Sequence, residues 1–333
     1  MARVLKRRTE EQASESLGGG VAADVVGRSP NEILWRKFRR DRFALIGLAV
    51  LGVLLALALL APLFSALVGH PPRRSYVFEM TGNFGIPRGP TLSSDAGVFL
   101  FGADATARDL FIRVVYGLRT SLLVAVLAVS VATFIGVSLG IIAGFYRGIV
   151  DTIISRLADI FFTLPVLMLI IGINSACGAQ PKGQECLGGL LQPGVPLLVA
   201  VLGIFGWPYL TRVIRGQVLS LREKEFVEAA RSLGASDLDI MVRHILPNVA
   251  APIIVIATLT LPSIVLTEAA LSFIGLGLPP TVPSLGQQID TASGLYRVAW
   301  WTMAFPGLFL VLLTLGFNLV GDALRDAFDP RTS

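Results

Sequence analysis

Few residues in this chain are arranged in a pattern that supports chemistry. The sequence contains no phosphate-binding loop of the form GxxxxGK[ST] and no HExxH zinc motif. Its two histidines, His70 and His244, are far apart along the chain. We therefore expect no catalytic residue, no metal site and no cofactor bound by the chain itself.

The remaining residues of chemical interest are polar side chains inside long apolar runs. A polar group within a lipid bilayer is costly, so such residues are considered first as functional. The candidates for a polar path through the membrane are Thr163, Asn174, Thr258, Thr260 and Glu268. The alternative is that each threonine bonds to its own helix and that Asn174 lies at the membrane interface.

The apolar runs themselves identify an integral membrane protein. Of the 333 residues, 53% are hydrophobic and 15% are charged, and the mean hydropathy is +0.71. This composition excludes soluble globular, disordered, collagen-like and disulfide-framework proteins. Six runs lack Asp, Glu, Lys and Arg, and each can cross ~30 Å of hydrocarbon as a helix. They are Phe43 to Pro72, Thr120 to Tyr146, Ile160 to Pro181, Leu187 to Thr211, Ile245 to Thr267 and Val298 to Gly321.

The runs are continuous, whereas the strands of an outer-membrane barrel alternate apolar and polar positions. The first run is also longer than the core of a signal peptide, about 7–15 residues, so we expect it to be retained as a span. The sequence therefore predicts an all-α integral membrane protein with six transmembrane helices.

The distribution of basic residues predicts its orientation. With six spans, both termini lie on the same side of the membrane as the loop from Arg212 to Arg243, and that side holds 20 Lys and Arg against 8 on the other. The positive-inside rule places the termini and this loop in the cytoplasm, which puts His70 and His244 on opposite sides. Topology explains the basic charge, and no nucleic-acid-binding motif accompanies it, so we expect no nucleic-acid partner.

Changes in composition divide the chain into regions. The predicted order is a disordered cytoplasmic tail over 1–28, an interfacial helix plus first span over 29–68, an external segment over 69–117, a transmembrane domain over 118–322 with a cytoplasmic loop over 215–248, and a cytoplasmic tail over 323–333. A capping box opens the basic, aromatic helix at Ser29. This helix either lies among lipid headgroups, which makes membrane lipid a partner, or continues directly into the first span.

Two spacings predict contacts made by the second and third spans. Gly136, Gly140 and Gly144 recur every four residues, a pattern that lets two helix backbones approach closely. Arg156 and Asp159 are spaced i, i+3 near the cytoplasmic end of the third span, where we expect an ion pair with a structural role.

Cys177 and Cys186 are the only cysteines of the chain. Both lie in the predicted external loop between the third and fourth spans. They either form a disulfide in an oxidising compartment or remain two thiols, because the sequence does not fix the distance between them.

The cytoplasmic loop between the fourth and fifth spans has the most informative pattern. Residues Glu223 to Leu233 predict a short helix that ends at Gly234, the residue type best suited to a left-handed helix terminus. A second helix is expected to begin at Ser236, which is followed by an acidic residue as in an imperfect capping box, and to run to Pro247. Such a helix–glycine–helix element on the cytoplasmic face is suited to docking another protein.

This element resembles the cytoplasmic motif of the membrane-spanning subunits of ABC importers. That motif is Glu-Ala-Ala, three residues, Gly, nine residues, then Ile-x-Leu-Pro. The matching residues here are Glu228, Ala229, Ala230, Gly234, Leu246 and Pro247, and His244 replaces the Ile. The segment from Arg243 to Asn248 is similar to the variant of the peptide/nickel branch of the family.

The resemblance extends over most of the chain. Residues 35–64 and 101–122 are similar to the N-terminal region and the external segment of the C-type subunit of dipeptide and oligopeptide importers, although Ala103 and Ala107 replace the usual Thr and Gly. Residues 271–277, 283–286 and 321–330 resemble the C-terminal third of that subunit. The family resemblance therefore favours a C-type permease subunit.

The resemblance implies a type I ABC importer transmembrane fold in the cytoplasmic (inner) membrane of a prokaryotic cell. The six motif residues would then couple the chain to ATPases. It implies three kinds of partner: a homologous B-type permease, two ATP-binding subunits that hold ATP and Mg²⁺, and an external substrate-binding protein. The implied cargo is dipeptides or oligopeptides, and the alternative is nickel chelates or another small solute.

Two other classes of protein agree less well with the sequence. A secondary transporter would have internal repeats, and the two halves of this chain show none. A membrane-embedded enzyme would have His, Asp, Ser or metal ligands converging at one depth in the membrane, and the sequence does not supply them. We therefore expect a transport subunit that is not itself an enzyme.

Overall fold

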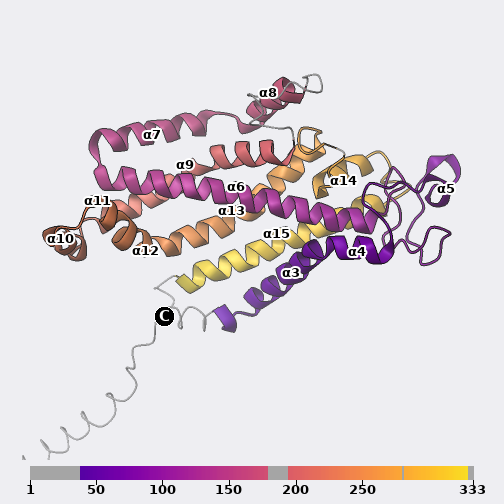
Figure 1. Cartoon of the computed structure of the whole chain (residues 1–333), viewed down its shortest axis with the longest axis horizontal. Coiled ribbons are helices and arrows are strands. Elements are labelled where there is room, and N and C mark those ends of the chain that lie inside the picture. The colour runs from indigo at the N-terminus through magenta and orange to yellow at the C-terminus, as the bar shows by residue number, and fades with distance from the viewer. Residues whose placement is uncertain (1–37, 179–193, 280, 329–333) are drawn as a thin grey trace, which may run out of the picture.

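A computed structural model describes residues 38–178, 194–279 and 281–328 (Figure 1). The side chains of residues 174–178, which include Asn174 and Cys177, are not part of this description, and Cys186 and the predicted helix at Ser29 lie outside it. Within the described residues the chain forms helices, and its only β-type pairings are four isolated bridges. The all-α prediction is confirmed.

Among the described residues, five helices are long and apolar enough to cross a membrane. They are α3 (Arg42–Leu59), α6 (Leu110–Tyr146), α9 (Val195–Leu221), α13 (Ala250–Phe273) and α15 (Trp301–Phe328). With 37 residues at ~1.5 Å each, α6 is about 55 Å long, so it extends beyond a bilayer at one or both ends. A sixth span is present if α7 (Gly148–Thr163) and α8 (Val166–Gly178) count as one span that is bent by 77°.

A sharp bend interrupts the predicted third span, Ile160 to Pro181. Leu164, between the two helices, has an extended backbone with φ −75° and ψ 123°. Pro165 follows it, and a proline both disfavours the helical conformation of the preceding residue and removes a backbone donor. The proline thus divides the helix into α7 and α8.

The two ends of the bundle differ in the elements they contain (Figure 1). One end has α10 (Glu225–Ser232), α11 (Asp237–Asp239), the π-helical segment η2 (Ile240–Ile245) and α12 (Leu246–Asn248). The other end has α4 (Ala61–Val68), α5 (Val77–Met80), η1 (Asn83–Gly85) and α14 (Leu285–Ala292). Helix α3 starts and α15 finishes towards the α10 end, as the predicted topology requires. We call these the cytoplasmic and external ends.

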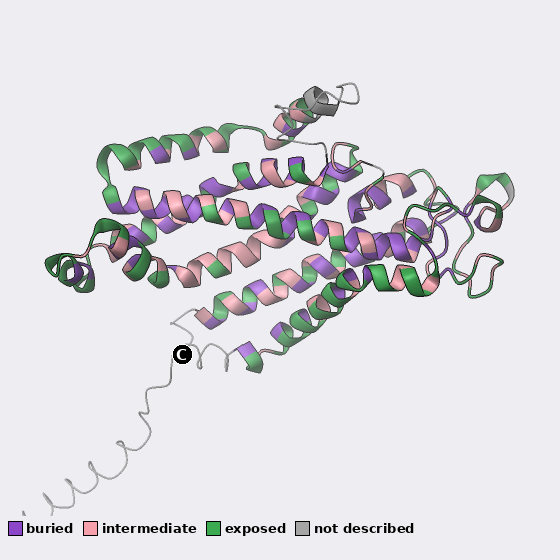
Figure 2. Ribbon diagram, viewed as in Figure 1, coloured by how far each residue is buried: buried purple, intermediate pink, exposed green. Residues whose placement is uncertain are grey.

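Helices α6 and α9 form the core of the bundle. Buried residues concentrate on them, whereas α7 is mostly exposed (Figure 2). A Cβ atom added to Gly140 would lie 2.9 Å from Ile214 Cβ, and one added to Gly144 would lie 2.7 Å from Val218 Cβ. The glycine spacing therefore allows the close approach of two backbones that the sequence predicts.

The external segment is an irregular structure fastened to the start of α6. Its small core contains Tyr76, Met80 and Phe99. Helix α6 begins at Leu110, earlier than the predicted boundary at 117, because the Asp109 side chain accepts a hydrogen bond from the backbone N–H of Ile112 and caps the helix.

Candidate functional site

The candidate site is the cytoplasmic projection, which we define as residues 223–248. Its first helix, α10, is anchored by two residues of one face, since Val227 is 1% exposed and Ala230 is 8% exposed. They pack in a cluster with Phe145 from the end of α6 and Ile240 from η2. The projection is thus attached to the bundle through a small hydrophobic core.

A tight turn at Gly234 connects the two helical parts of the projection. Gly234 has φ +85°, in the left-handed region that favours glycine. The next N–H, of Ala235, donates to the carbonyl oxygen of Ala230 at 3.1 Å. Ser236 then accepts a hydrogen bond from the N–H of Asp239 at 3.2 Å and caps the second part. The predicted helix–glycine–helix element is present.

The second part differs from the single α-helix that the sequence predicts. A π-helical stretch, η2, separates the short helices α11 and α12. Its side chains Ile240, Met241 and Ile245 are buried in the same core as α10. Segments of π-helix are rare and occur often at functional sites. The apolar spacing predicts a helix here but not its hydrogen-bond register.

The outer face of α10 is exposed. Of its small and apolar residues Phe226, Ala229, Ala230 and Leu233, only Ala230 is buried, and Leu233 is 89% exposed. Glu228 is exposed as well and has no ion-pair partner among the described residues. An apolar face beside an unpaired carboxylate, outside the membrane, is suited to binding another protein.

Arginines connect the projection to the end of α6. The side chain of Arg147 lies 2.6 Å from Glu223, and the Arg222 guanidinium donates to the carbonyl oxygen of Phe145. The Arg231 guanidinium lies over the Phe145 ring, 5.8 Å from its centre. A force on α10 therefore has a direct route to α6.

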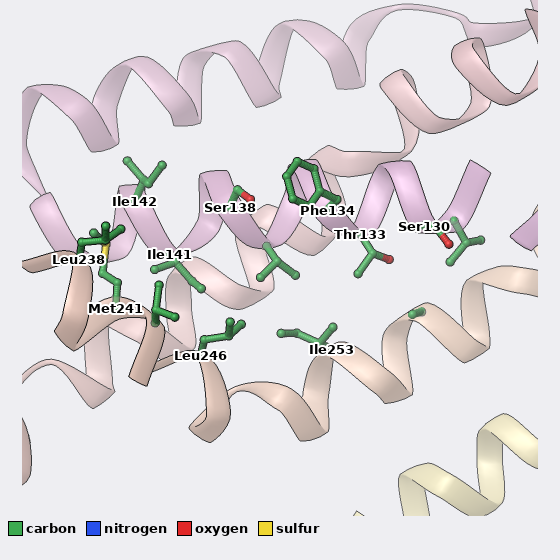
Figure 3. A pocket seen from close by; sticks show the side chains of 14 residues that line it. Ser130, Thr133, Phe134, Ser138, Ile141, Ile142, Leu238, Met241, Leu246 and Ile253 are labelled. Carbon is green, nitrogen blue, oxygen red and sulfur yellow. The ribbon is translucent and has the colours of Figure 1, made fainter. Parts of the chain in front are cut away.

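Of the remaining motif residues, Leu246 is half-buried at the start of α12 and Pro247 is exposed within that helix. Leu246 lines a cavity of about 700 Å³ between the projection, α6 and α13 (Figure 3). Its walls are Val129, Ser130, Thr133, Phe134, Val137, Ser138, Ile141, Ile142, Leu238, Met241, Val242, Leu246, Ile253 and Ala257. A smaller cavity of about 20 Å³ shares Val129, Thr133 and Ala257 with it.

The predicted path residues do not gather at this cavity. Thr163, Thr258 and Thr260 each donate to a carbonyl oxygen of the preceding turn of their own helix, at 2.7–2.8 Å. Of the three, Thr260 alone lines one of these two cavities, the smaller one. The alternative interpretation, that the threonines bond to their own helices, describes their geometry.

Glu268 is fully buried and lines neither cavity. Its carboxylate accepts hydrogen bonds from Ser121 of α6 and from Ser272 of its own helix, each at 2.8 Å. Ser272 also accepts from the N–H of Leu278 at 3.3 Å. In this conformation Glu268 joins α6, α13 and the loop after α13.

The pair of Arg156 and Asp159 is part of a larger set of contacts. The Arg156 guanidinium nitrogen lies 3.8 Å from the Asp159 carboxylate, whereas a guanidinium nitrogen of Arg212 in α9 lies 2.5 Å from it. The shorter contact crosses from α7 to α9, which sequence spacing along one helix does not predict. No group of three or more His, Cys, Asp or Glu suited to a metal ion occurs among the described residues.

Ser138 lies within a short glycine–serine motif of α6. Residues Gly136 to Gly140 match the letters of the GxSxG nucleophile motif. That motif requires a sharp turn from a strand into a helix, which exposes the serine. Here the five residues lie in the middle of α6, so the pattern does not mark a nucleophile.

Comparison with known families assigns this architecture. The family described as "binding-protein-dependent transport system inner membrane component" matches residues 136–333, which include the whole cytoplasmic projection. The chain belongs to this family. A second family, the N-terminal transmembrane domain of oligopeptide transport permease C, matches residues 29–77. The protein is therefore a permease-type component of the inner membrane, as the motif resemblance predicts.

Relatives of this permease match nearly its whole length. It is 37% identical to a dipeptide transport system permease protein, DppC, of Alkalihalophilus pseudofirmus, over 91% of this chain and 90% of the relative. It is 34% identical to the oligopeptide permease protein OppC of Bacillus subtilis, over 90% of each chain. It is also 34% identical to the glutathione permease protein GsiD of Pectobacterium atrosepticum, over 93% and 94%.

A solved structure supports the fold of the permease. A chain of the MetNI methionine ABC transporter, in an inward-facing conformation, superposes with a TM-score of 0.51 at 21% identity. The match covers 65% of this chain and 96% of the other. The predicted type I ABC importer transmembrane fold is confirmed.

Proposed function

We propose that this permease forms half of the translocation path of an ATP-driven importer of dipeptides or oligopeptides. The observation that supports this most strongly is the cytoplasmic projection. It combines an exposed apolar face, an unpaired Glu228 and the glycine turn at Gly234, at the spacing of the importer motif. In a chain that acts alone, each of these features would be unfavourable in free energy and would serve no purpose.

The coupling role belongs to Glu228, Ala229, Ala230, Gly234, Leu246 and Pro247. Ala229 is small enough to let a partner approach the α10 backbone, and Glu228 offers a charge to a basic residue of that partner. Leu246 and Pro247 lie where the projection meets α13. A displacement of α10 would thus be passed both to α6 and to α13.

The partners required by this proposal are a homologous B-type permease, two ATP-binding subunits and an external substrate-binding protein. ATP and Mg²⁺ would bind to the ATP-binding subunits. The present chain would contribute transport and no hydrolysis. Membrane lipid surrounds the apolar outer faces of the bundle.

The proposed cargo follows from the relatives, whose names specify dipeptides, oligopeptides and glutathione. Glutathione is itself a small peptide, so the three names share the peptide class. A nickel chelate or another small solute is the second candidate, based on the Arg243–Asn248 segment that resembles the peptide/nickel branch. Competition of labelled dipeptide uptake by unlabelled peptides and by nickel chelates separates the two.

The test of the coupling role is gentle purification of the tagged chain from its native membranes, with the wild type compared with Glu228→Arg. We expect a second permease and ATP-binding subunits to accompany the wild type. Glu228→Arg should reach the membrane in normal amount but lose the ATP-binding subunits and uptake. Asp95→Arg, the same charge reversal on an exposed residue of the external segment, should retain the ATP-binding subunits. Isolation of the wild type alone, or full activity of Glu228→Arg, would contradict the proposal.

A further inference from the structure

Two hydroxyl groups at the large cavity lack the hydrogen bond to their own helix that several other hydroxyls of the bundle make. Ser130 and Thr314, for example, donate to carbonyl oxygens of their own helices at 2.7 and 2.8 Å. Thr133 and Ser138 have no hydrogen-bond partner among the described residues, although both line the cavity. Figure 3 shows Thr133 directed into the space between α6 and α13.

An unpaired hydroxyl is unfavourable within a membrane because lipid tails offer no donor or acceptor. Helical threonine and serine ordinarily avoid this cost by bonding to the preceding turn of the helix. The free hydroxyls of Thr133 and Ser138 therefore point to a polar occupant of the cavity, such as water or a solute. An acyl chain or an apolar helix face would leave them unpaired.

The position of the cavity connects it to the coupling element. Four residues of the cytoplasmic projection, Leu238, Met241, Val242 and Leu246, form its cytoplasmic wall. Thr133 also lines the small cavity, together with Tyr209 and Thr260, so the two cavities meet at this residue. A movement of the projection changes the wall of the large cavity directly.

We propose that Thr133 and Ser138 line the part of the translocation path that this chain contributes, with the cytoplasmic projection as its movable wall. This inference rests on the proposed function. Neither residue is among the path candidates that the sequence suggests, because their run is as apolar as any other span. In the structure, both combine an unpaired hydroxyl with a place on the cavity wall. The path they define lies on α6, while Thr163 and Thr258 lie on helices α7 and α13 with their hydroxyls already bonded.

The lining also indicates the class of solute. None of the 14 residues around the large cavity is charged. A neutral wall provides no strong site for either sign of charge, and a hydroxyl group both donates and accepts hydrogen bonds. These properties match a solute that carries both donors and acceptors and must leave again, such as a peptide with compensating terminal charges.

The test is thiol labelling of the assembled importer in proteoliposomes. Cys177 and Cys186 are first replaced with serine, and this background must still take up peptide. Thr133→Cys and Ser138→Cys are then treated with a charged, membrane-impermeant thiol reagent. The control is Leu127→Cys, an exposed α6 position that lines neither cavity. Labelling is measured without nucleotide and with ATP plus vanadate.

We expect the charged reagent to label Thr133→Cys and Ser138→Cys at rates that differ at least about tenfold between the two nucleotide states, and to leave Leu127→Cys unlabelled. Labelling only by a neutral, lipid-soluble maleimide would mean that lipid fills the cavity and would overturn the inference. Protection from both reagents in both states would indicate a protein contact and would overturn it as well. In either case an importer that still assembles and transports leaves the proposed function intact, whereas failure of the ATP-binding subunits to co-purify removes the proposed function itself.

A second measurement tests the hydroxyl group instead of the position. Thr133→Val removes the hydroxyl at nearly constant volume, and Thr314→Val does the same at a hydroxyl bonded to its own helix. Loss of one path hydrogen bond should lower peptide uptake by about two- to tenfold in Thr133→Val. Equal uptake by Thr133→Val and Thr314→Val would contradict a role of the hydroxyl in the path.

Discussion

His70 Nδ1 lies 2.6 Å from Asp109 Oδ2, and the other oxygen of the same carboxyl group caps α6. The opposite ring nitrogen of His70 bonds to the carbonyl oxygen of Ala96 at 2.7 Å. Both residues are buried. This one pair thus joins two parts of the external segment to the first turn of the longest helix in the bundle.

The pair makes the stability of the external segment depend on pH. Burial raises the pKa of the Asp109 carboxyl group above its ordinary value, despite the opposing hydrogen bond from His70. Because the pKa is higher in the folded protein than in the unfolded chain, folding favours the protonated acid. The contribution of this carboxyl group to the free energy of unfolding is therefore present below about pH 4 and is lost as the pH rises through the raised pKa. Asp109→Asn keeps a capping side chain that does not titrate. We therefore expect the melting temperature of Asp109→Asn in detergent, relative to that of the wild type, to be higher at pH 8 than at pH 5.

The control for this effect is Asp95→Asn, an exposed position of the same segment. Its difference from the wild type should be the same at both pH values. A difference between Asp109→Asn and the wild type that is also independent of pH would show that the Asp109 carboxyl group does not titrate with folding.

A second prediction concerns Ala107, which replaces the glycine usual in related subunits. The structure gives Ala107 a φ of +57°, in the left-handed region. A residue with a side chain pays roughly 1–2 kcal/mol for this conformation, and glycine does not. Ala107→Gly should therefore raise the free energy of unfolding by about 1 kcal/mol, measured by protease resistance of the external segment.

Ala103→Gly is the matched comparison because it makes the same change four residues away. Ala103 is fully buried and its φ is not positive. Glycine there gains no relief of strain and loses a packed methyl group, so the segment should become less stable. The same gain from both substitutions would rule out relief of strain at Ala107.

The sequence predicts those features that depend on local spacing and on apolar length. The glycines of α6, the turn at Gly234 and the cap at Ser236 are all local patterns, and all are present. The choice of span boundaries is less accurate because a helix cap such as Asp109 extends a helix beyond its charge-free run. Arg113 is an example: this charged residue precedes the charge-free run, yet it lies inside α6, where it is fully buried and paired with Asp104 at 3.0 Å.

Features that depend on a second element were missed, for a physical reason. The contact of Asp159 with Arg212 joins two helices that are distant in sequence, and Glu268 meets Ser121 across the bundle. Whether a hydroxyl is bonded to its own helix or is free, as in Thr133, depends on the rotamer and on what faces it. Residue type alone therefore nominates Thr163 and Thr133 equally.

A third prediction tests the packing of α6 on α9. A Cβ atom on Gly140 would lie 3.0 Å from the Thr211 carbonyl oxygen as well as close to Ile214, and a backbone atom cannot move aside without shifting α9. Gly140→Ala should cost about 1–3 kcal/mol and lower the melting temperature in detergent. Gly216→Ala in α9, where nothing lies within 4 Å of the new atom, should be neutral or slightly stabilising. Equal effects of the two substitutions would exclude close packing as the cause.

The last prediction separates the shape of the cytoplasmic projection from its charge. Gly234 has open space around its missing Cβ, so a substitution there acts through backbone conformation and not through a clash. Gly234→Val should disfavour the left-handed turn, misplace α10 and reduce both uptake and retention of the ATP-binding subunits, with membrane insertion unchanged. Gly234→Asn should retain more of both activities, because asparagine enters the left-handed region more readily than a β-branched residue does. If Val and Asn have the same effect, the requirement at this position is for a small surface residue that a partner contacts, and the turn geometry is not what the coupling depends on.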